Sequence, residues 1–136
     1  MSTQIDKVKM LTFKENSDDR GKLVVVEGLK DIPFDIKRIF YIYGSDGDVV
    51  RGYHANRRTK FVLINLCGSS KVKVKNGKSE EVFVLDKPNE GIYLPNMIWK
   101  EMYKFSSDSI LLVLASELYD SNEYIKNYTD FLEEVK

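Results

Sequence analysis

The sequence predicts a single all-β domain, a sandwich or barrel of short strands followed by one short C-terminal helix. Aromatic residues make up 12% of the chain, with eight Tyr and seven Phe, and these residue types favour strands. Runs rich in β-branched and aromatic residues recur along the chain, separated by turn-forming clusters. No repeat or Pro/Gly-rich linker interrupts residues 1–136, so we expect one domain over this whole range.

Ten strands are expected from these runs. They lie near Lys9–Phe13, Lys22–Glu27, Ile36–Tyr43, Val49–Asn56, Phe61–Cys67, Lys71–Lys75, Glu81–Leu85, Gly91–Leu94, Ile98–Phe105 and Ser109–Ser116. Asn76-Gly77, between the sixth and seventh of these strands, is a strong hairpin signal. From Ser121 to Lys136, apolar residues recur at three- and four-residue spacing, which predicts the helix.

The composition excludes several classes of partner. The 21 basic residues balance 21 acidic ones, so there is no general electrostatic attraction to nucleic acid. The single cysteine allows neither an intrachain disulfide nor a thiolate metal cluster. The N-terminus lacks the apolar run of a secretory signal, and the longest apolar stretch, Ile110 to Ala115, is too short to span a bilayer. We expect a cytoplasmic protein that binds neither nucleic acid nor membranes.

The only histidine of the chain, His54, stands in the segment Arg51-Gly52-Tyr53-His54-Ala55-Asn56-Arg57-Arg58. Strand alternation places Gly52, His54 and Asn56 on one face and Arg51 and Tyr53 on the other. Three interpretations are open: a buried structural histidine, a metal ligand or an acid/base group. A metal ion needs about three protein ligands, and no second histidine exists, so we expect no metal. Histidine, which transfers protons near neutral pH, and arginines, which bind phosphate, together suit a phosphorylated sugar.

Several segments, in the same order, resemble the WxcM-like sugar 3,4-ketoisomerases. They are Asp35-Ile36-Lys37-Arg38-Ile39-Phe40-Tyr41-Ile42, then Arg51-Gly52-Tyr53-His54-Ala55, then Gly91-Ile92-Tyr93-Leu94-Pro95 with Trp99-Lys100-Glu101-Met102, and finally Val113-Leu114-Ala115-Ser116 with Tyr119-Asp120 and Glu123-Tyr124-Ile125. The resemblance covers roughly residues 7–130. It implies a cupin-type double-stranded β-helix (a jelly-roll barrel) that isomerises dTDP-4-keto-6-deoxyglucose to its 3-keto isomer through an enediol(ate).

The resemblance further implies that no cofactor is used and that the protein is a homodimer with exchanged N-terminal strands. The implied role is deoxyamino-sugar biosynthesis for surface polysaccharide, such as the O-antigen of lipopolysaccharide. Two alternatives stay open: a related nucleotide-sugar epimerase, and a cupin that binds a nucleotide sugar without turnover.

The sequence departs from the family pattern beside His54. His54 matches the first histidine of the family's His-x-His pair, but the second position holds Asn56, and an amide cannot act as a general base. Either His54 alone transfers both protons, with Tyr41, Tyr53 or a water as partner, or Asn56 orients an oxyanion. A different substrate, or no isomerase activity, is a further possibility.

These considerations give a set of predicted site residues. The predicted catalytic residues are His54, Asn56 and Tyr41. The predicted substrate-binding residues are Arg20, Arg38, Arg51, Tyr53, Asn65, Trp99, Lys100 and Glu101. We expect the arginines to bind phosphate or sugar oxygens, and Glu101 to pair with an arginine.

Overall fold

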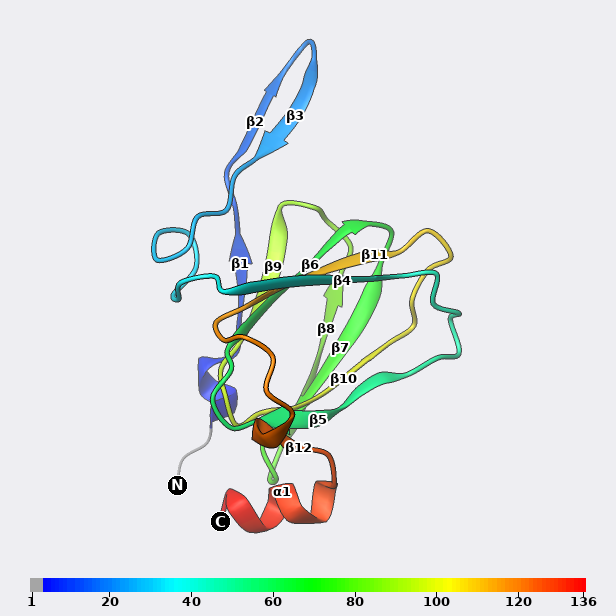
Figure 1. The fold of residues 1–136 in the computed structure, drawn as a ribbon. Helices are drawn as coiled ribbons and strands as arrows, with labels where there is room; N and C mark the ends of the chain where they lie inside the picture. Colours follow the sequence, from blue (N-terminus) through cyan, green and yellow to red (C-terminus); the bar gives the residue numbers. More distant parts are fainter. Residues whose placement is uncertain (1–3) are drawn as a thin grey trace.

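The computed structural model describes residues 4–136 as two five-stranded antiparallel sheets, a projecting hairpin and a short C-terminal helix (Figure 1). The strands are β1 (Lys9–Thr12), β2 (Glu15–Asp18), β3 (Gly21–Val24), β4 (Arg38–Tyr43), β5 (Arg51–Asn56), β6 (Phe61–Cys67), β7 (Ser70–Lys75), β8 (Glu80–Leu85), β9 (Glu90–Leu94), β10 (Trp99–Tyr103), β11 (Ile110–Ala115) and β12 (Tyr124–Ile125). The helical segments are η1 (Gln4–Lys7), η2 (Ser121–Glu123) and α1 (Tyr128–Glu134).

The two sheets form the predicted cupin-type barrel. One has the order β1-β9-β6-β11-β4 and the other the order β12-β5-β10-β7-β8. Inward-facing residues of both sheets meet in the main core, among them Leu63, Val72, Val74 and Val113, each at most 2% exposed. Burial of an aliphatic side chain of this kind contributes about 1.5–3 kcal/mol. The barrel therefore rests on the alternation of apolar residues along facing strands.

The first sheet is covered on its outer face as well. There Val62, Ile64 and Leu114 pack against Phe34 and Ile32 from the loop between β3 and β4. Because both faces of β6 are buried, its sequence is an almost continuous apolar run instead of an alternating one.

The predicted strands are confirmed, with shifted ends. For example, β5 begins at Arg51 instead of Val49, and β3 ends at Val24. The strands β2 and β12 were not predicted. The predicted single helix over residues 121–136 is interrupted: residues 121–123 form the 3-10 helix η2, but the prediction is wrong for residues 124–127, which hold strand β12 and the N-cap of α1. There Asn127 caps α1, because its side chain accepts the Asp130 N–H.

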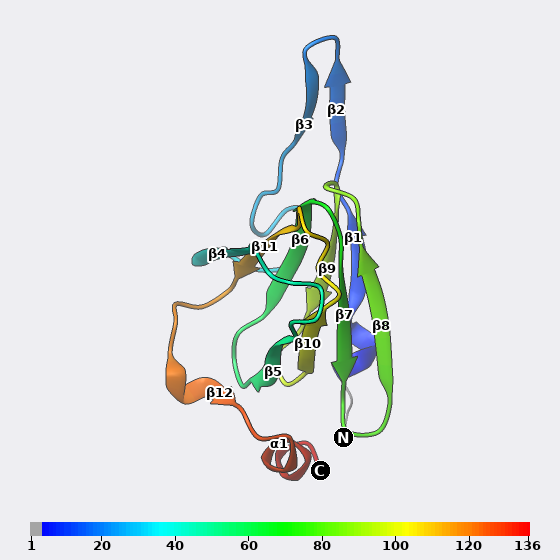
Figure 2. The ribbon, with the colours of Figure 1, turned by 90° about the vertical axis from the view of Figure 1, so that its right-hand side faces the viewer.

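The hairpin formed by β2 and β3 projects from the barrel at the end opposite α1 (Figures 1 and 2). Its Leu23 side chain is 61% exposed. None of the helices found in residues 4–136 combines the length and apolar character needed to cross a bilayer.

Candidate active site

A cavity of about 140 Å³ lies between the two sheets, beside β5 and β10. Apolar side chains form most of its wall, and His54, Lys100 and Arg51 add ionisable groups. The full lining is Phe40, Ile42, Arg51, Gly52, His54, Phe61, Leu63, Lys100, Met102, Val113 and Tyr124. A mostly apolar cavity with a few convergent polar groups is the usual form of a small-molecule site.

A bulge in β5 shapes this wall. Lys100 lies opposite His54, but the next residue, Glu101, lies opposite Gly52, so Tyr53 is an extra residue in the strand. Gly52 and Tyr53 both have positive φ, 93° and 57°. A Cβ at Gly52 would lie 2.8 Å from the Lys100 carbonyl oxygen, so this close approach requires glycine.

The bulge corrects the predicted alternation of β5. Arg51 and His54 were expected on opposite faces, yet both line the cavity. Tyr53 is 51% exposed and is not part of the cavity lining. Regular alternation fails here because the extra residue reverses the side on which the preceding residues lie.

His54 is held in the form that accepts a proton. Its Nδ1 lies 3.0 Å from the Gly52 carbonyl oxygen, and since a carbonyl only accepts, Nδ1 carries the hydrogen and Nε2 has the free lone pair. The ring packs against Tyr124, with 4.8 Å between ring centroids. Burial, reinforced by the positive charge of Lys100, lowers the pKa of His54 to about 4. The imidazole is therefore neutral at pH 7.

Lys100 is 5% exposed, which is unusual for a lysine. Its Nζ donates a hydrogen bond of 3.1 Å to Asn56 Oδ1 and lies 4.2 Å from the centroid of the Phe61 ring. Within residues 4–136 the ammonium bonds this amide and forms no ion pair with a carboxylate. Burial lowers the pKa of Lys100 to about 7, with Glu123 opposing the shift and Arg38 adding to it.

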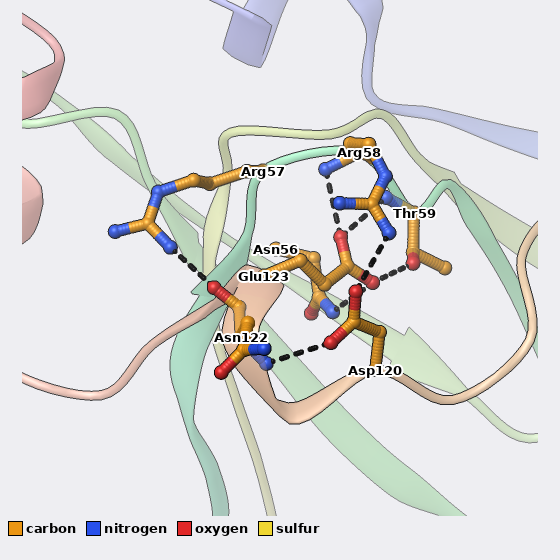
Figure 3. A network of polar contacts seen from close by, with 7 residues as sticks. All are labelled: Asn56, Arg57, Arg58, Thr59, Asp120, Asn122 and Glu123. Atoms are coloured by element: carbon orange, nitrogen blue, oxygen red, sulfur yellow. Dashed lines mark hydrogen bonds and ion pairs between the residues drawn. The ribbon is translucent and has the colours of Figure 1, made fainter.

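Glu123 anchors a buried polar network next to the cavity (Figure 3). Its Oε1 accepts the Arg58 and Thr59 backbone N–H groups at 2.8 and 2.9 Å. Its Oε2 accepts the Asn56 amide at 3.1 Å and the Thr59 hydroxyl. Burial alone opposes ionisation, but the hydrogen bonds outweigh it, so the pKa of Glu123 lies below its usual value.

Asn56, predicted as catalytic, is 1% exposed and lies behind the cavity wall. A lysine only donates and a carboxylate only accepts, so the amide oxygen must face Lys100 and the amide nitrogen must face Glu123. Asn56 thus connects these two charged groups.

Arg38 on β4 is a second unusual cation. Its Nε and one terminal nitrogen, Nη2, are buried without a hydrogen-bond partner. The guanidinium lies 5.3 Å from the ring centroid of Phe40 and 5.6 Å from that of Tyr119. Buried donors without partners are costly, and an anionic ligand would supply the missing acceptors.

Other predicted residues lie away from this cavity. Tyr41 is on the outer face of β4, 62% exposed and stacked on Tyr43, because the alternate residues Phe40 and Ile42 point inward. Asn65 is fully buried, where its side chain bonds Ser109, Ser70 and the Cys67 carbonyl. The structure thus gives Tyr41 an exposed position and gives Asn65 protein partners.

Trp99 and Glu101 alternate with Lys100 on β10, so they point to the opposite side of the sheet. There Trp99 packs on Phe131 of α1 and donates Nε1–H to Glu101 at 3.1 Å. The expectation that Glu101 pairs with an arginine is wrong, because its ion partner is Lys75, at 3.6 Å.

Arg20 lies in the turn of the projecting hairpin, exposed and paired with Asp18 at 2.7 Å. The hairpin is at the far end of the molecule from α1 (Figure 1). The structure therefore does not bring Arg20 to the His54 cavity of its own chain.

Tyr124 and Glu123 are site residues that sequence reasoning missed, because their spacing was read as helical. The polar residues Asp120 and Asn127, both suited to capping, mark where η2 and α1 begin. Within residues 4–136, no three His, Cys, Asp or Glu side chains gather closely enough to hold a metal ion.

Comparison with known proteins places this chain in one family. Residues 6–136 match the family described as "FdtA: WxcM-like, C-terminal". A TDP-4-oxo-6-deoxy-alpha-D-glucose-3,4-oxoisomerase from Aneurinibacillus thermoaerophilus is 42% identical over 123 residues, covering 90% of this chain and 88% of the relative.

Solved structures of 3,4-ketoisomerases have the same fold as this chain. A mutant of the 3,4-ketoisomerase QdtA from Thermoanaerobacterium thermosaccharolyticum, in complex with TDP-4-keto-6-deoxyglucose, has a TM-score of 0.92 at 42% identity and covers 94% of this chain and 93% of its own. The TDP-fucose-3,4-ketoisomerase WlaRA from Campylobacter jejuni has a TM-score of 0.91 at 41% identity, covering 95% and 96%.

The fold and the cavity thus define a cupin whose central cavity is lined by apolar residues and by the ionisable groups His54, Lys100 and Arg51. The chain belongs to the WxcM-like family, and the relatives described above are sugar-nucleotide 3,4-ketoisomerases.

Proposed function

We propose that the cavity beside His54 converts TDP-4-keto-6-deoxyglucose into its 3-keto isomer. The main support for this proposal is the neutral imidazole of His54, which the Gly52 carbonyl orients in the cavity. The relatives of this chain are named for this type of reaction. Such a chain is a nucleotide-sugar 3,4-ketoisomerase.

The chemistry follows from the substrate. The C3 proton is acidic because it is next to the C4 carbonyl, and His54 Nε2 removes it to give an enediolate. Return of a proton to C4 gives the 3-keto sugar. The base must be unprotonated before it can act, and the low pKa of His54 meets this requirement.

Arg38 and Arg51 are the proposed anion-binding groups. Arg51 lines the cavity, and Arg38 has buried donors free to bond phosphate or sugar oxygens. The predicted substrate contacts of Trp99, Glu101, Asn65 and Tyr53 stay predictions, and none of these residues lines the cavity.

The test is incubation with TDP-4-keto-6-deoxyglucose in deuterated water, followed by NMR and mass spectrometry. We expect deuterium at C3 or C4, together with the 3-keto product. His54→Ala should abolish both while TDP still binds. Exchange at C5 instead would identify an epimerase, and TDP binding with no exchange would identify a non-catalytic binding protein.

We also propose that the chain forms a homodimer through its N-terminal hairpin. Strand β1 pairs with β9 of its own chain, whereas β2 and β3 pair with each other and with no other strand among residues 4–136, so this hairpin can cross to a partner. Apolar residues form a groove of about 250 Å³ on the outer face of the first sheet, namely Val24, Val26, Ile36, Ile39, Ile64, Leu66, Pro88, Leu112 and Leu114. Together with the exposed Leu23, this groove supports an interface with a second copy.

The dimer would also explain Arg20, which lies far from the cavity of its own chain and would act in that of the partner. Co-expression of Arg20→Ala and His54→Ala chains tests this, because a mixed dimer contains one complete site. We expect activity in the mixture that neither variant shows alone. Monomers in analytical ultracentrifugation, or no complementation, would contradict the proposed dimer. The role in surface-polysaccharide biosynthesis stays a proposal from the resemblance, and the cytoplasmic location stays a proposal from the composition of the sequence.

A further inference from the structure

Isomerisation moves a proton on oxygen as well as one on carbon. The substrate carries hydrogens on C3 and O3 and a carbonyl at C4, whereas the product carries a carbonyl at C3 and hydrogens on C4 and O4. His54 accounts for the carbon proton. Asn56 cannot transfer the oxygen proton, because an amide does not titrate near neutral pH.

We propose that Lys100 is the second catalytic residue, carrying the proton between O4 and O3 of the sugar, and that Asn56 is a positioning residue that holds its ammonium group. This inference rests on the proposed function and assigns a second role within the same cavity.

The placement of Lys100 supports this role. It is the register partner of His54 across β5 and β10, and both side chains line the cavity. The Arg51 guanidinium lines it too, but guanidinium groups do not release their proton in proteins.

The charges around Lys100 make its proton labile. His54 on β5 and Arg38 on β4 offer it no negative charge, and Glu123 in η2 is separated from it by the Asn56 amide. Burial without a carboxylate partner brings the pKa of Lys100 to about 7. A group that titrates near the working pH serves equally well as acid and as base.

The steps balance without an outside reagent. First, His54 Nε2 takes the C3 proton while the Lys100 ammonium gives a proton to O4, which forms a neutral enediol. Then the Lys100 amine takes the proton from O3 while the imidazolium of His54 returns its proton to C4. The product is the 3-keto sugar, and both residues regain their starting protonation.

Asn56 acts through Lys100. Its oxygen accepts the Nζ hydrogen bond, and Glu123 fixes the amide in the required orientation. A hydrogen bond to the charged form favours that form, so Asn56 also raises the pH at which Lys100 loses its proton.

The pH dependence of kcat/KM tests the assignment. For the wild type we expect a rise near pH 4, as His54 loses its proton, and a fall near pH 7, as Lys100 loses its own. Lys100→Met should lower kcat by about 100-fold or more and remove the fall near pH 7. TDP affinity, measured by calorimetry, reports whether the variant is folded. Lys71→Met, at an exposed lysine on the neighbouring strand β7, should match the wild type.

Lys100→Arg separates proton transfer from electrostatic stabilisation. The fixed positive charge should still stabilise the enediolate, so deuterium exchange at C3 persists, but the 3-keto product forms at least about 100-fold more slowly. Asn56→Ala should lower kcat about 10-fold at similar KM and move the fall near pH 7 to lower pH. A residue with only a structural role would leave the position of that fall unchanged.

Failure of the proposed function and failure of the Lys100 assignment give different results. If the wild type shows neither exchange nor 3-keto product, the proposed function fails, and the role of Lys100 fails with it. If the wild type is active but Lys100→Met keeps the fall near pH 7, or Lys100→Arg makes product at the wild-type rate, then Lys100 is not the carrier and the isomerase assignment stands. Loss of the fall in Tyr124→Phe, and not in Lys100→Met, would transfer the role to Tyr124.

Discussion

Asn56 on β5 and Glu123 in η2 stand 67 residues apart in the chain and share a buried hydrogen bond of 3.1 Å. The bond joins the strand that bears His54 to the segment that supplies Tyr124. It also orients the amide toward Lys100. One contact therefore stabilises the barrel wall and sets the position of an ionisable group in the cavity.

Removal of the Glu123 carboxylate should destabilise the protein strongly. Glu123→Ala leaves the Arg58 and Thr59 backbone N–H groups and the Asn56 amide without their acceptor. We expect the free energy of unfolding to fall by about 3 kcal/mol, measured by urea denaturation. Glu133→Ala, at an exposed helical position, should change it by less than about 0.5 kcal/mol. Equal effects of the two substitutions would contradict the importance of the buried network.

The Glu123 carboxylate should also make the stability of the protein depend on pH in the acidic range. Since the pKa of Glu123 is lower in the folded protein than its usual 4.5, the folded state binds fewer protons than the unfolded state in this range. The stabilisation is complete above pH 4.5 and is lost as the pH falls through the folded pKa. Urea midpoints of the wild type and Glu123→Ala should therefore converge below pH 4.5. A constant difference from pH 7 to pH 3 would exclude this linkage.

Lys100 should make stability rise with pH as well, but at neutral to alkaline pH. Its pKa is about 7 in the folded protein against an ordinary 10.5, so between these values the unfolded state binds more protons. The wild type should gain stability relative to Lys100→Met as the pH rises from 7 toward 10. A constant difference in the free energy of unfolding between the wild type and Lys100→Met from pH 7 to pH 10 would show that Lys100 is not desolvated in the folded state.

Gly52→Ala should disturb the bulge that places Arg51 and His54 on the same cavity. The added Cβ would meet the Lys100 carbonyl at 2.8 Å, and φ is 93°. We expect a loss of about 1–3 kcal/mol in stability and a clear fall in kcat. Gly44→Ala is the matched control, because it also has positive φ (75°) but nothing within 4 Å of its Cβ position. Activity should be lost only in the Gly52 variant.

Arg38→Met should weaken TDP binding without destabilising the free protein. The buried Nε and Nη2 donors of Arg38 have no hydrogen-bond partner among residues 4–136, so their removal breaks no hydrogen bond. If they bond the ligand, their loss costs about 1.5–3 kcal/mol, which is about 10- to 100-fold in Kd by calorimetry. Arg58→Met, which removes a surface ion pair with Asp120, should leave Kd unchanged. Unchanged affinity in Arg38→Met would exclude Arg38 from the anion site.

Much of the barrel could be predicted, because its strands are apolar runs bounded by turn residues. The segment at Tyr124 and Ile125 could not, since an apolar stripe at helical spacing does not distinguish a helix from a short strand followed by one. Tyr124 and Ile125 form the short strand β12, which pairs with Asn56 and Ala55 of β5.

The cavity was predicted in part. His54, Arg51 and Lys100 line it, as residue type and family resemblance indicated. Strand alternation puts Trp99 and Glu101 on the opposite face of β10 from Lys100. These three residues therefore cannot all line the cavity, and only Lys100 does. The bulge at Tyr53 depends on pairing across two strands, which the local sequence does not contain.

Tyr124 forms one wall of the cavity, although it lies 70 residues beyond His54 in the chain. During synthesis on the ribosome, most of the barrel strands emerge before this residue does. The cavity therefore stays open on one side until residues 121–125 leave the exit tunnel and dock on β5. A nascent chain stalled before that point would expose His54 and Lys100 in an unfinished site, and it could not yet turn over a sugar nucleotide.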